Sequence, residues 1–381
     1  MKSHNDDWNA QNYVNKKTNP SFLSDYNPDS KILGGKLPKQ ISQPSRRSSN
    51  MGKLDPTPTL VPDEDVRFRL KPSNGLRLTI LDISTSSDSI TSSIADYRQE
   101  NGRTYHRYKD GKYTFPNDDQ ENERLVSADM QHHMFLLTFN GRLGLAPPNE
   151  PNSKVERVLD VGTGTGIWAM DYGDEHRGAQ VVGIDLSPIQ PRFVPPNVQF
   201  YVDDLEEPWD YPQPFDYIHS RMMTASIASW DKYLSDIFEV RNLAPGGYLE
   251  LQELDIFAKS DDGSLTADHA LSKWLTLIHG ASVQLGRPYQ DIDGLKSRMA
   301  EAGFTDIVET IFKWPMNTWP QDRRYKELGA WHKENMNLGL ESFSMALLTR
   351  AHGWAKEQVD VLLDEVRKDL SNKRIHAYWP M

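Results

Sequence analysis

The sequence contains no cysteine among its 381 residues. This absence excludes disulfide bonds, zinc sites built on thiolates and mechanisms that use a cysteine nucleophile. A metal site would have to depend on histidines and carboxylates. The adjacent His132 and His133 would face different sides of a helix and would make a poor pair of metal ligands. We therefore expect no metal.

Long apolar runs are also missing. No stretch approaches the ~20 apolar residues that a membrane-spanning helix requires, and the polar segment 1–20 lacks the apolar centre of a secretory signal. The net charge of -11 excludes a chain-wide basic surface for nucleic acids. We expect a cytoplasmic or nuclear protein without membrane association or direct nucleic-acid binding. The sparse basic residues Lys39 and Arg46-Arg47 are better explained as solvated charges than as a nuclear signal.

Apolar residues make up only 37% of the chain, which is below the usual share of a fully globular protein. Residues 1–90 are rich in Ser, Asn, Pro, Asp and Lys and poor in aromatic side chains. Such a segment cannot bury enough apolar surface to offset the entropy lost on ordering. We predict a disordered N-terminal tail over 1–90, a helical N-terminal arm over 91–150 and one α/β domain over 151–381.

Strands and helices alternate after residue 154. The apolar pattern predicts strands at 155–161, 180–186, 198–202, 215–219 and 248–254, and helices at 118–140 and 229–243. A further helix is expected at 295–302, and two last strands at 306–313 and 374–379. A helical insert at about 320–370 would separate these two strands. Strands alternating with helices at this rhythm favour a parallel, doubly wound sheet.

A glycine-rich segment follows the first of these strands and opens a helix. It reads Val158-Leu-Asp160-Val-Gly162-Thr-Gly164-Thr-Gly166. Glycines here allow a tight turn and the close approach of a ligand, and the first N–H groups of the helix lack intrahelical partners. The spacing G-x-G-x-G differs from the G-x-G-x-x-G of dinucleotide enzymes. The segment therefore predicts a ligand-binding loop, although glycines that serve only as a turn are the alternative.

Acidic residues accompany the glycines. Asp160 precedes the loop, Asp185 ends the second strand, and Asp203-Asp204-Leu205 follows the third. The Asp185 carboxylate can accept both ribose hydroxyls of a nucleoside, and Asp204 with Leu205 can read and cover an adenine. Acidic strand ends that face one crevice suit an adenosine with a cationic tail better than a pyrophosphate. We predict S-adenosyl-L-methionine as the cofactor, with Asp160, Thr163 and Leu186 among its contacts.

Six segments make the sequence similar to the fungal LaeA-like class I methyltransferases, a group that includes regulators of secondary metabolism. They are Glu100-Asn-Gly-Arg-Thr-Tyr-His106, Leu159-Asp-Val-Gly-Thr-Gly-Thr-Gly-Ile-Trp-Ala169, Asp185-Leu-Ser-Pro-Ile-Gln-Pro191, Glu206-Glu-Pro-Trp209, Phe215-Asp-Tyr-Ile-His-Ser-Arg221 and Leu243-Ala-Pro-Gly-Gly-Tyr-Leu-Glu-Leu-Gln-Glu253. The resemblance implies a Rossmann-like class I methyltransferase fold with a mainly parallel seven-stranded sheet and helical additions. It also implies that Gly162, Gly164 and Gly166 bind the cofactor, Asp185 its ribose, and Asp204 with Leu205 its adenine. It gives no methyl acceptor.

Catalytic groups are harder to identify because a sulfonium already activates its methyl group. Orientation of the acceptor alone can supply roughly 7–11 kcal/mol of the barrier, and a base is needed only when the acceptor must lose a proton. His219, at the end of the fourth strand, is the candidate base, with a hydrogen-bonded structural histidine as the alternative. Tyr105, beside His106 in the arm, could face the sulfonium or simply pack there.

Four tryptophans gather in the C-terminal third: Trp314, Trp319, Trp331 and Trp354. They would line a flat apolar substrate pocket or hold a helical lid on the sheet. We predict an S-adenosylmethionine-dependent methyltransferase that acts in or regulates fungal secondary metabolism, with a small-molecule substrate and a protein partner left open. The alternative is a non-catalytic regulatory module that binds the cofactor and partner proteins.

Overall fold

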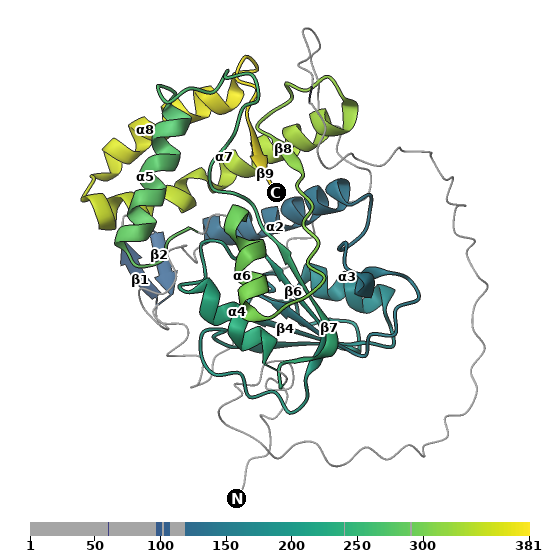
Figure 1. The fold of residues 1–381 in the computed structure, drawn as a ribbon. Helices are drawn as coiled ribbons and strands as arrows, with labels where there is room; N and C mark the ends of the chain where they lie inside the picture. The colour runs from purple at the N-terminus through teal and green to yellow at the C-terminus, as the bar shows by residue number, and fades with distance from the viewer. Residues whose placement is uncertain (1–59, 61–96, 101–102, 107–118, 240, 290–291) are drawn as a thin grey trace, which may run out of the picture.

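The computed structural model describes residues 60, 97–100, 103–106, 119–239, 241–289 and 292–381. The predicted N-terminal tail lies outside the described residues except for Leu60. A hairpin of β1 (Tyr97–Glu100) and β2 (Arg103–His106) comes before helix α2 (Asp119–Thr138). Figure 1 shows a sheet region and a separate group of helices, with α2 between them.

A five-stranded parallel sheet forms the centre of the α/β domain. Its order is β5-β4-β3-β6-β7, and every neighbouring pair is parallel. The strands are β3 (Arg157–Val161), β4 (Gln180–Asp185), β5 (Val198–Val202), β6 (Phe215–Arg221) and β7 (Leu243–Gln252). The chain moves outward from β3 to β5 and then returns to the other side at β6. Sheets of this kind bind ligands at the carboxyl ends of the strands where the order reverses, which here is between β3 and β6.

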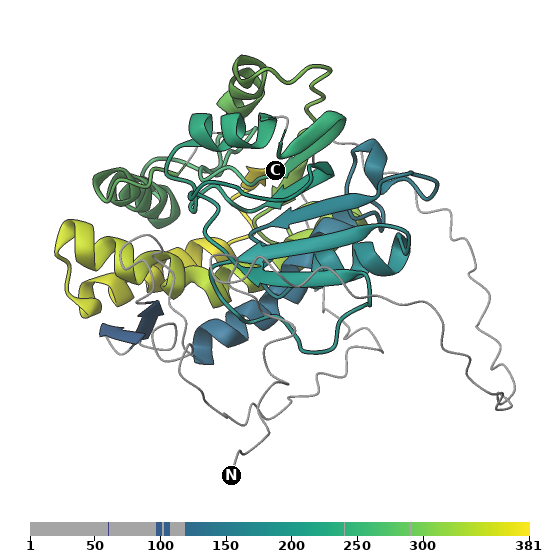
Figure 2. The ribbon, with the colours of Figure 1, turned by 90° about the horizontal axis from the view of Figure 1, so that it is seen from below.

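Helices cover both faces of this sheet (Figure 2). Successive residues of a strand point to opposite faces. Val158 therefore packs with Trp168 of α3, whereas the next residue, Leu159, packs with Trp230 of α4 and Leu295 of α6. Burial on both sides explains the nearly continuous apolar strands. The helices are α3 (Ile167–Glu175), α4 (Trp230–Phe238) and α6 (Leu295–Ala302).

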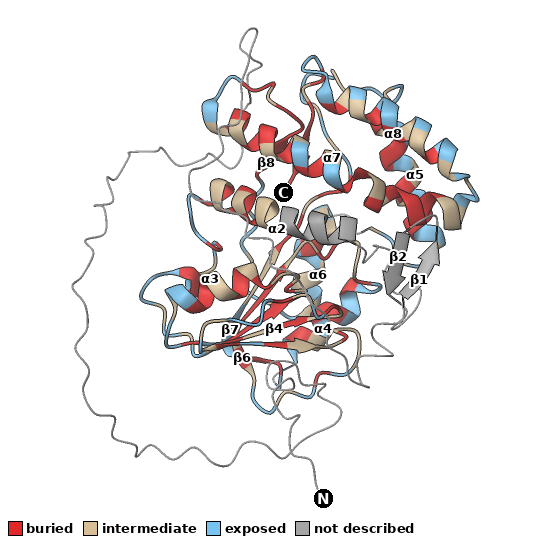
Figure 3. Ribbon diagram, turned by 180° about the vertical axis from the view of Figure 1, so that it is seen from behind, coloured by how far each residue is buried: buried red, intermediate tan, exposed pale blue. Residues whose placement is uncertain are grey.

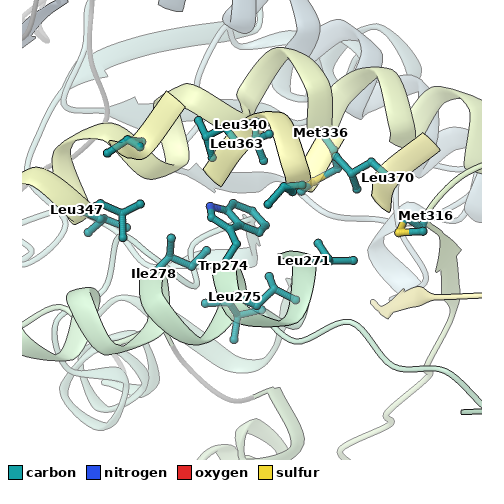
Figure 4. Close-up of a cluster of buried hydrophobic side chains, with 14 of the residues drawn as sticks. Leu271, Trp274, Leu275, Ile278, Met316, Met336, Leu340, Leu347, Leu363 and Leu370 are labelled. Atoms are coloured by element: carbon teal, nitrogen blue, oxygen red, sulfur yellow. The ribbon is translucent and has the colours of Figure 1, made fainter. Parts of the chain in front are cut away.

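A second apolar core joins three helices of the C-terminal third. Figure 4 shows Trp274 of α5 among leucines of α5, α7 and α8. Trp274 is 2% exposed, and its Nε1 donates a 2.8 Å hydrogen bond to Ser344 Oγ of α7. The helices are α5 (Ala270–Gln284), α7 (Arg323–His352) and α8 (Lys356–Ser371). The last two occupy the region of the predicted helical insert.

Helix α2 links the two cores, because it packs against both α3 and α7. Gln131 Nε2 donates to Asn335 Oδ1 of α7 over 3.2 Å, and Trp314 Nε1 donates to Thr138 Oγ1 over 3.0 Å. Figure 3 shows buried residues along α7 and in the sheet. None of the described helices combines the length and apolar character needed to cross a bilayer. Two short 3-10 helices complete the described fold: η2 (Pro147–Asn149) and η3 (Ile292–Gly294).

The structure corrects three sequence predictions. Seven strands in one sheet are not confirmed, because β8 (Lys313–Pro315) and β9 (Tyr378–Pro380) form a separate antiparallel pair. The predicted strand at 306–313 is wrong over most of its length. Val308 is 87% exposed there, so no buried face holds an extended segment. The helix predicted at 229–243 ends at Phe238, because Leu243 already pairs in β7 with Phe215.

Candidate active site

A cavity of about 260 Å³ lies at the carboxyl ends of the central strands. The loops after β3, β4, β5 and β6 form one side of it. Helices α2, α5 and α7, together with β9, form the other side. The cavity therefore runs from the sheet edge into the helical region, between the two apolar cores.

The glycine loop lies on the sheet side of the cavity. Gly162, Gly164 and Gly166 have φ values of 67°, 56° and 80°, a region that other residues rarely adopt. A Cβ at Gly162 would collide with the Met223 side chain, whereas a Cβ at Gly164 would meet nothing within 4 Å. Gly162 is thus required by packing. Gly164 leaves open space beside the main chain, as a ligand cradle requires.

Asp185 connects this loop with the end of β4. Its Oδ2 accepts a 2.9 Å hydrogen bond from the Gly164 N–H, and its Oδ1 accepts a 3.0 Å hydrogen bond from the Ser187 N–H. Burial raises the pKa of Asp185, while these backbone hydrogen bonds lower it. The carboxylate lines the cavity beside Leu186, and its contact with a ribose stays a prediction.

The segment after β5 forms the far end of the sheet side. Asp203, Asp204 and Leu205 all line the cavity. Asp204 Oδ1 accepts a 3.1 Å hydrogen bond from the Glu206 N–H, and Trp209 Nε1 donates to the Leu205 carbonyl over 2.8 Å. The buried indole of Trp209 thereby holds the backbone of Leu205. This arrangement fits the predicted adenine contacts of Asp204 and Leu205.

Glu206 connects the loop after β5 with the segment that follows α5. Its carboxylate forms a 2.8 Å ion pair with Arg287 and accepts the Ala228 N–H over 2.9 Å. Arg287 also donates to the Ser226 carbonyl over 2.9 Å. Because both partners are only slightly exposed, the pair fixes the position of Arg287 at the cavity wall.

Asp160 and His219 lie behind the glycine loop and do not line the cavity. Asp160 Oδ2 accepts from Thr163 Oγ1 over 2.5 Å, and Asp160 Oδ1 lies 2.7 Å from His219 Nδ1. His219 is 0% exposed and stacks on Trp168 at 3.7 Å between ring centroids. A histidine enclosed in this way cannot reach an acceptor in the cavity. The geometry favours the alternative, a structural histidine, and gives Asp160 the role of holding Thr163 in the loop.

Two other sequence hypotheses concern aromatic residues. Tyr105 lies in β2, whose backbone pairing alone the structure describes, so its role near the sulfonium stays a prediction. Trp314 and Trp319 are buried, and none of the four C-terminal tryptophans named above lines the cavity. Their packing supports a structural role in the helical region. The tryptophans that do line the cavity are Trp274 and Trp379.

The end of the cavity that lies between α5 and α7 is mainly apolar. Helices α5 and α7 contribute Trp274, Ile278, Met336 and Phe343. Polar atoms there include the Asp255 carboxylate, which accepts the Phe257 N–H over 3.1 Å and lies 3.5 Å from Lys259 Nζ. A mostly apolar chamber with a few fixed polar groups is typical of small-molecule sites.

Carboxylates outnumber guanidinium groups around the cavity. The lining carboxylates are Asp185, Asp203, Asp204, Glu206 and Asp255, and the lining guanidinium groups are Arg221 and Arg287. This excess of negative charge favours a cationic ligand. With the open cradle at Gly164 and the Asp185 carboxylate at the end of β4, the residues fit S-adenosylmethionine.

Comparisons with known proteins show the family of this chain. A family profile described as a methyltransferase domain matches residues 130–309. The chain is 40% identical to Methyltransferase pytC of Aspergillus terreus over 317 residues, which cover 82% of this chain and 95% of that protein. It is 39% identical to the secondary metabolism regulator LAE1 of Cochliobolus heterostrophus, over 73% of this chain and 91% of that protein.

A third relative is the protein-methionine methyltransferase laeA of Emericella nidulans, at 35% identity over 74% of each chain. Among solved structures, Haemonchus contortus phosphoethanolamine N-methyltransferase 2 with S-adenosyl-L-methionine gives a TM-score of 0.36 at 19% identity, covering 71% of this chain and 53% of that one.

The fold and the site thus define a class I methyltransferase that uses S-adenosyl-L-methionine. Within that class, the chain belongs to the fungal LaeA-like family, which includes pytC and the regulators of secondary metabolism.

The sequence hypotheses missed several residues of this site. Gln190 and Arg221 both lie in segments that carry the family resemblance, yet neither received a role. Gln190 Nε2 donates to the carbonyl oxygens of Gly164 and Ser187 over 2.6 and 3.0 Å, and Arg221 lines the cavity. A charged residue at the end of a buried strand is a signal that could have pointed to Arg221. Residues of α5 and α7 gave no comparable signal, because only the folded chain brings them to the sheet edge.

Proposed function

We propose that this methyltransferase modifies a largely apolar small molecule in fungal secondary metabolism. The observation that carries the proposal is one continuous cavity that joins the cofactor edge to the apolar chamber between α5 and α7. The relatives named above support the metabolic setting, since they include pytC and regulators of secondary metabolism.

S-adenosylmethionine, when bound, supplies a methyl group made electrophilic by its sulfonium. The chain then has to position the acceptor and exclude water. The buried side chains of Trp274 and Ile278 provide an apolar wall, and Phe343 extends it along α7. Such a wall binds an acceptor by surface burial, which contributes roughly 25 cal/mol per Å² of apolar area.

An acceptor that carries a hydroxyl must also lose a proton. Of the described carboxylates that line the cavity, Asp255 alone follows β7, whereas Asp185 ends β4 and the others follow β5. It is 5% exposed and faces the acceptor side together with Tyr289. Burial raises the pKa of Tyr289, so its hydroxyl stays protonated at neutral pH and can donate a hydrogen bond. Asp255 is therefore our candidate for the group that orients an acceptor hydroxyl and takes its proton.

A second candidate function is the methylation of a methionine in a protein. One relative is named as a protein-methionine methyltransferase, and Met222, Met223 and Met336 of this chain line the cavity. A thioether attacks a methyl group through a sulfur lone pair and loses no proton, so this chemistry needs no base. Methylation of a methionine in another protein would suit a regulatory role.

Isotope transfer separates these functions. The full chain would be incubated with methyl-labelled S-adenosylmethionine, with and without a fungal metabolite extract. We expect label in a small molecule only when extract and enzyme are both present, and much less label with Asp185→Ala at a cofactor concentration that does not saturate the variant. Label on protein alone would favour the second candidate. Cofactor binding without transfer to either pool would contradict both and favour a non-catalytic module.

A further inference from the structure

Arg221 is the last residue of β6, and its side chain lines the cavity. In the described part of the chain, no carboxylate lies within ion-pair distance of its guanidinium. Its polar contact is Nη1 to His132 Nδ1 at 3.3 Å, and its Cζ lies 4.8 Å from the ring centroid of Phe135. An enclosed cation without a counter-ion is costly, and the attraction of an aromatic face offsets only a small part of that cost.

The other guanidinium of the cavity differs in this respect. Arg287 is already paired with Glu206 at 2.8 Å. Among the described cations that line the cavity, Arg221 is therefore the one left to compensate an anionic group of a ligand.

The order of the strands indicates which group this is. Along the carboxyl edge, Leu205 follows β5, Asp185 ends β4, Gly164 follows β3 and Arg221 ends β6. Neighbouring strands are about 4.8 Å apart. A cofactor with its adenine at β5 and its ribose at β4 continues past the glycine loop toward β6. The part of S-adenosylmethionine that lies beyond the ribose is its methionine tail.

We propose that Arg221 binds the α-carboxylate of the methionine tail of the cofactor. A guanidinium can form two parallel hydrogen bonds with a carboxylate, which makes it a suitable partner. Burial lowers the pKa of Arg221 to about 10, while Asp160 and Asp171 raise it, so the side chain is cationic at neutral pH.

His132 of α2 positions the guanidinium. Its Nδ1 accepts from Arg221, so its hydrogen is on Nε2, which donates to Asp171 Oδ2 over 3.0 Å. Burial lowers the pKa of His132, although the hydrogen bond to Asp171 raises it. The neutral ring therefore connects Arg221 with a carboxylate of α3 and leaves the remaining N–H groups of the guanidinium for the ligand.

Two ligands that differ only in the amino-acid tail test this assignment. S-adenosylhomocysteine carries the α-carboxylate, and 5′-methylthioadenosine keeps the nucleoside but lacks that group. Arg221→Met removes the charge and keeps an apolar stem. We expect it to weaken S-adenosylhomocysteine about ten- to a hundredfold and to change 5′-methylthioadenosine by less than about threefold, both measured by calorimetry on the full chain.

Arg287→Met is the matched control, because it removes a guanidinium from the same cavity that is already paired. It should leave the ratio of the two affinities as in the unmodified protein. Arg221→Lys provides a second variant should Arg221→Met fail to fold. Lysine keeps the positive charge but lacks the planar guanidinium that forms two parallel hydrogen bonds. We therefore expect a smaller loss of affinity, which again affects S-adenosylhomocysteine alone. Equal losses for both ligands, or an unchanged affinity for S-adenosylhomocysteine, would overturn the proposal. Because binding is measured without an acceptor, these outcomes are independent of the proposed function.

Discussion

Gln190 donates a hydrogen bond of 2.6 Å from its Nε2 to the main-chain carbonyl oxygen of Gly164. A second hydrogen bond from the same atom, 3.0 Å long, reaches the carbonyl of Ser187. One buried amide thus joins the glycine loop to the turn after β4, and Asp185 accepts N–H groups from the same two residues. The Ser-Pro-Ile-Gln-Pro segment therefore has a structural explanation, because its glutamine fixes the two stretches of backbone that hold the Asp185 carboxylate.

Replacing this amide should weaken cofactor binding without direct loss of a cavity contact. Two hydrogen bonds worth about 0.5–1.5 kcal/mol each are lost in Gln190→Leu, so we expect S-adenosylhomocysteine to bind about five- to a hundredfold more weakly. Calorimetry measures the change. Gln199→Leu, at an exposed position of β5, is the control and should bind normally. Equal affinity in the two variants would show that Gln190 does not organise the loop.

A substitution of Gly164 tests whether the open space beside the glycine loop holds the cofactor. Gly164→Ala forces an alanine to a φ of 56° and places a Cβ in the open space beside the loop. We expect S-adenosylmethionine and its demethylated product to be weakened alike, since the contact concerns the shared part of both. Gly353 is a matched control, because it has a φ of 66°, has nothing within 4 Å and caps α7 away from the cavity. Gly353→Ala should cost about 1 kcal/mol of stability and leave both affinities unchanged.

Glu253 holds the turn after β6 and should make the stability of the protein depend on pH. It accepts from Met223 N and Thr224 N at 3.0 Å and from Thr224 Oγ1 at 2.6 Å. Burial raises its pKa from 4.5 to about 7, while the hydrogen bonds from Thr224 and Met223 lower it. Between these values the folded protein keeps a proton that the unfolded chain releases. The stability from this group is therefore present at low pH and is lost as pH rises through about 7.

The variant Glu253→Gln has no such proton. Its melting temperature should lie below that of the unmodified protein by an amount that shrinks from about pH 5 to about pH 8. Thermal melts at both ends of this range provide the measurement. A difference that stays constant would argue against a raised pKa at this site.

Truncating Trp274 should lower the stability of the protein and its affinity for the acceptor, and it should leave the affinity for the cofactor unchanged. Trp274 fills the core between α5, α7 and α8, and its hydrogen bond to Ser344 is lost on truncation. Trp274→Ala should reduce the free energy of unfolding by about 3–5 kcal/mol, measured by urea denaturation. Affinity for S-adenosylhomocysteine should stay close to that of the unmodified protein. A cost below about 0.5 kcal/mol, as for a surface site, would contradict the packing.

Local patterns predicted the central part of the fold well. The structure has β5 at Val198–Val202 and α6 at Leu295–Ala302, as expected from their apolar runs. These elements are buried by near neighbours, so their periodicity is visible in short windows. The segment around Val308 shows the limit, because its apolar residues resemble a strand although Val308 is 87% exposed and Ile311 is 37% exposed.

The lining of the cavity at the sheet edge could be predicted for a similar reason. The glycine loop, Asp185 and Asp204 follow strands directly, and parallel strands end at one edge of the sheet. The helical side of the cavity could not be predicted. Met336 of α7 and Trp379 of β9 lie far along the chain from β3, and tertiary packing alone brings them to the cavity. His219 shows the reverse error, since its position at a strand end suggested access whereas stacking on Trp168 encloses it.

The central claim is that an adenosine cofactor binds at this edge through Asp185. Calorimetric titration of the full chain with S-adenosylhomocysteine, for the unmodified protein and for Asp185→Ala, tests it most directly, with melts in the absence of ligand to verify folding. The variant loses two charge-assisted hydrogen bonds to ribose and also leaves the Gly164 N–H without its carboxylate. We expect a loss of about tenfold to a thousandfold in affinity, and a smaller loss in Asp185→Asn, which keeps one acceptor. Unchanged affinity in a folded Asp185→Ala variant would contradict the ribose assignment and the placement of the cofactor at this edge.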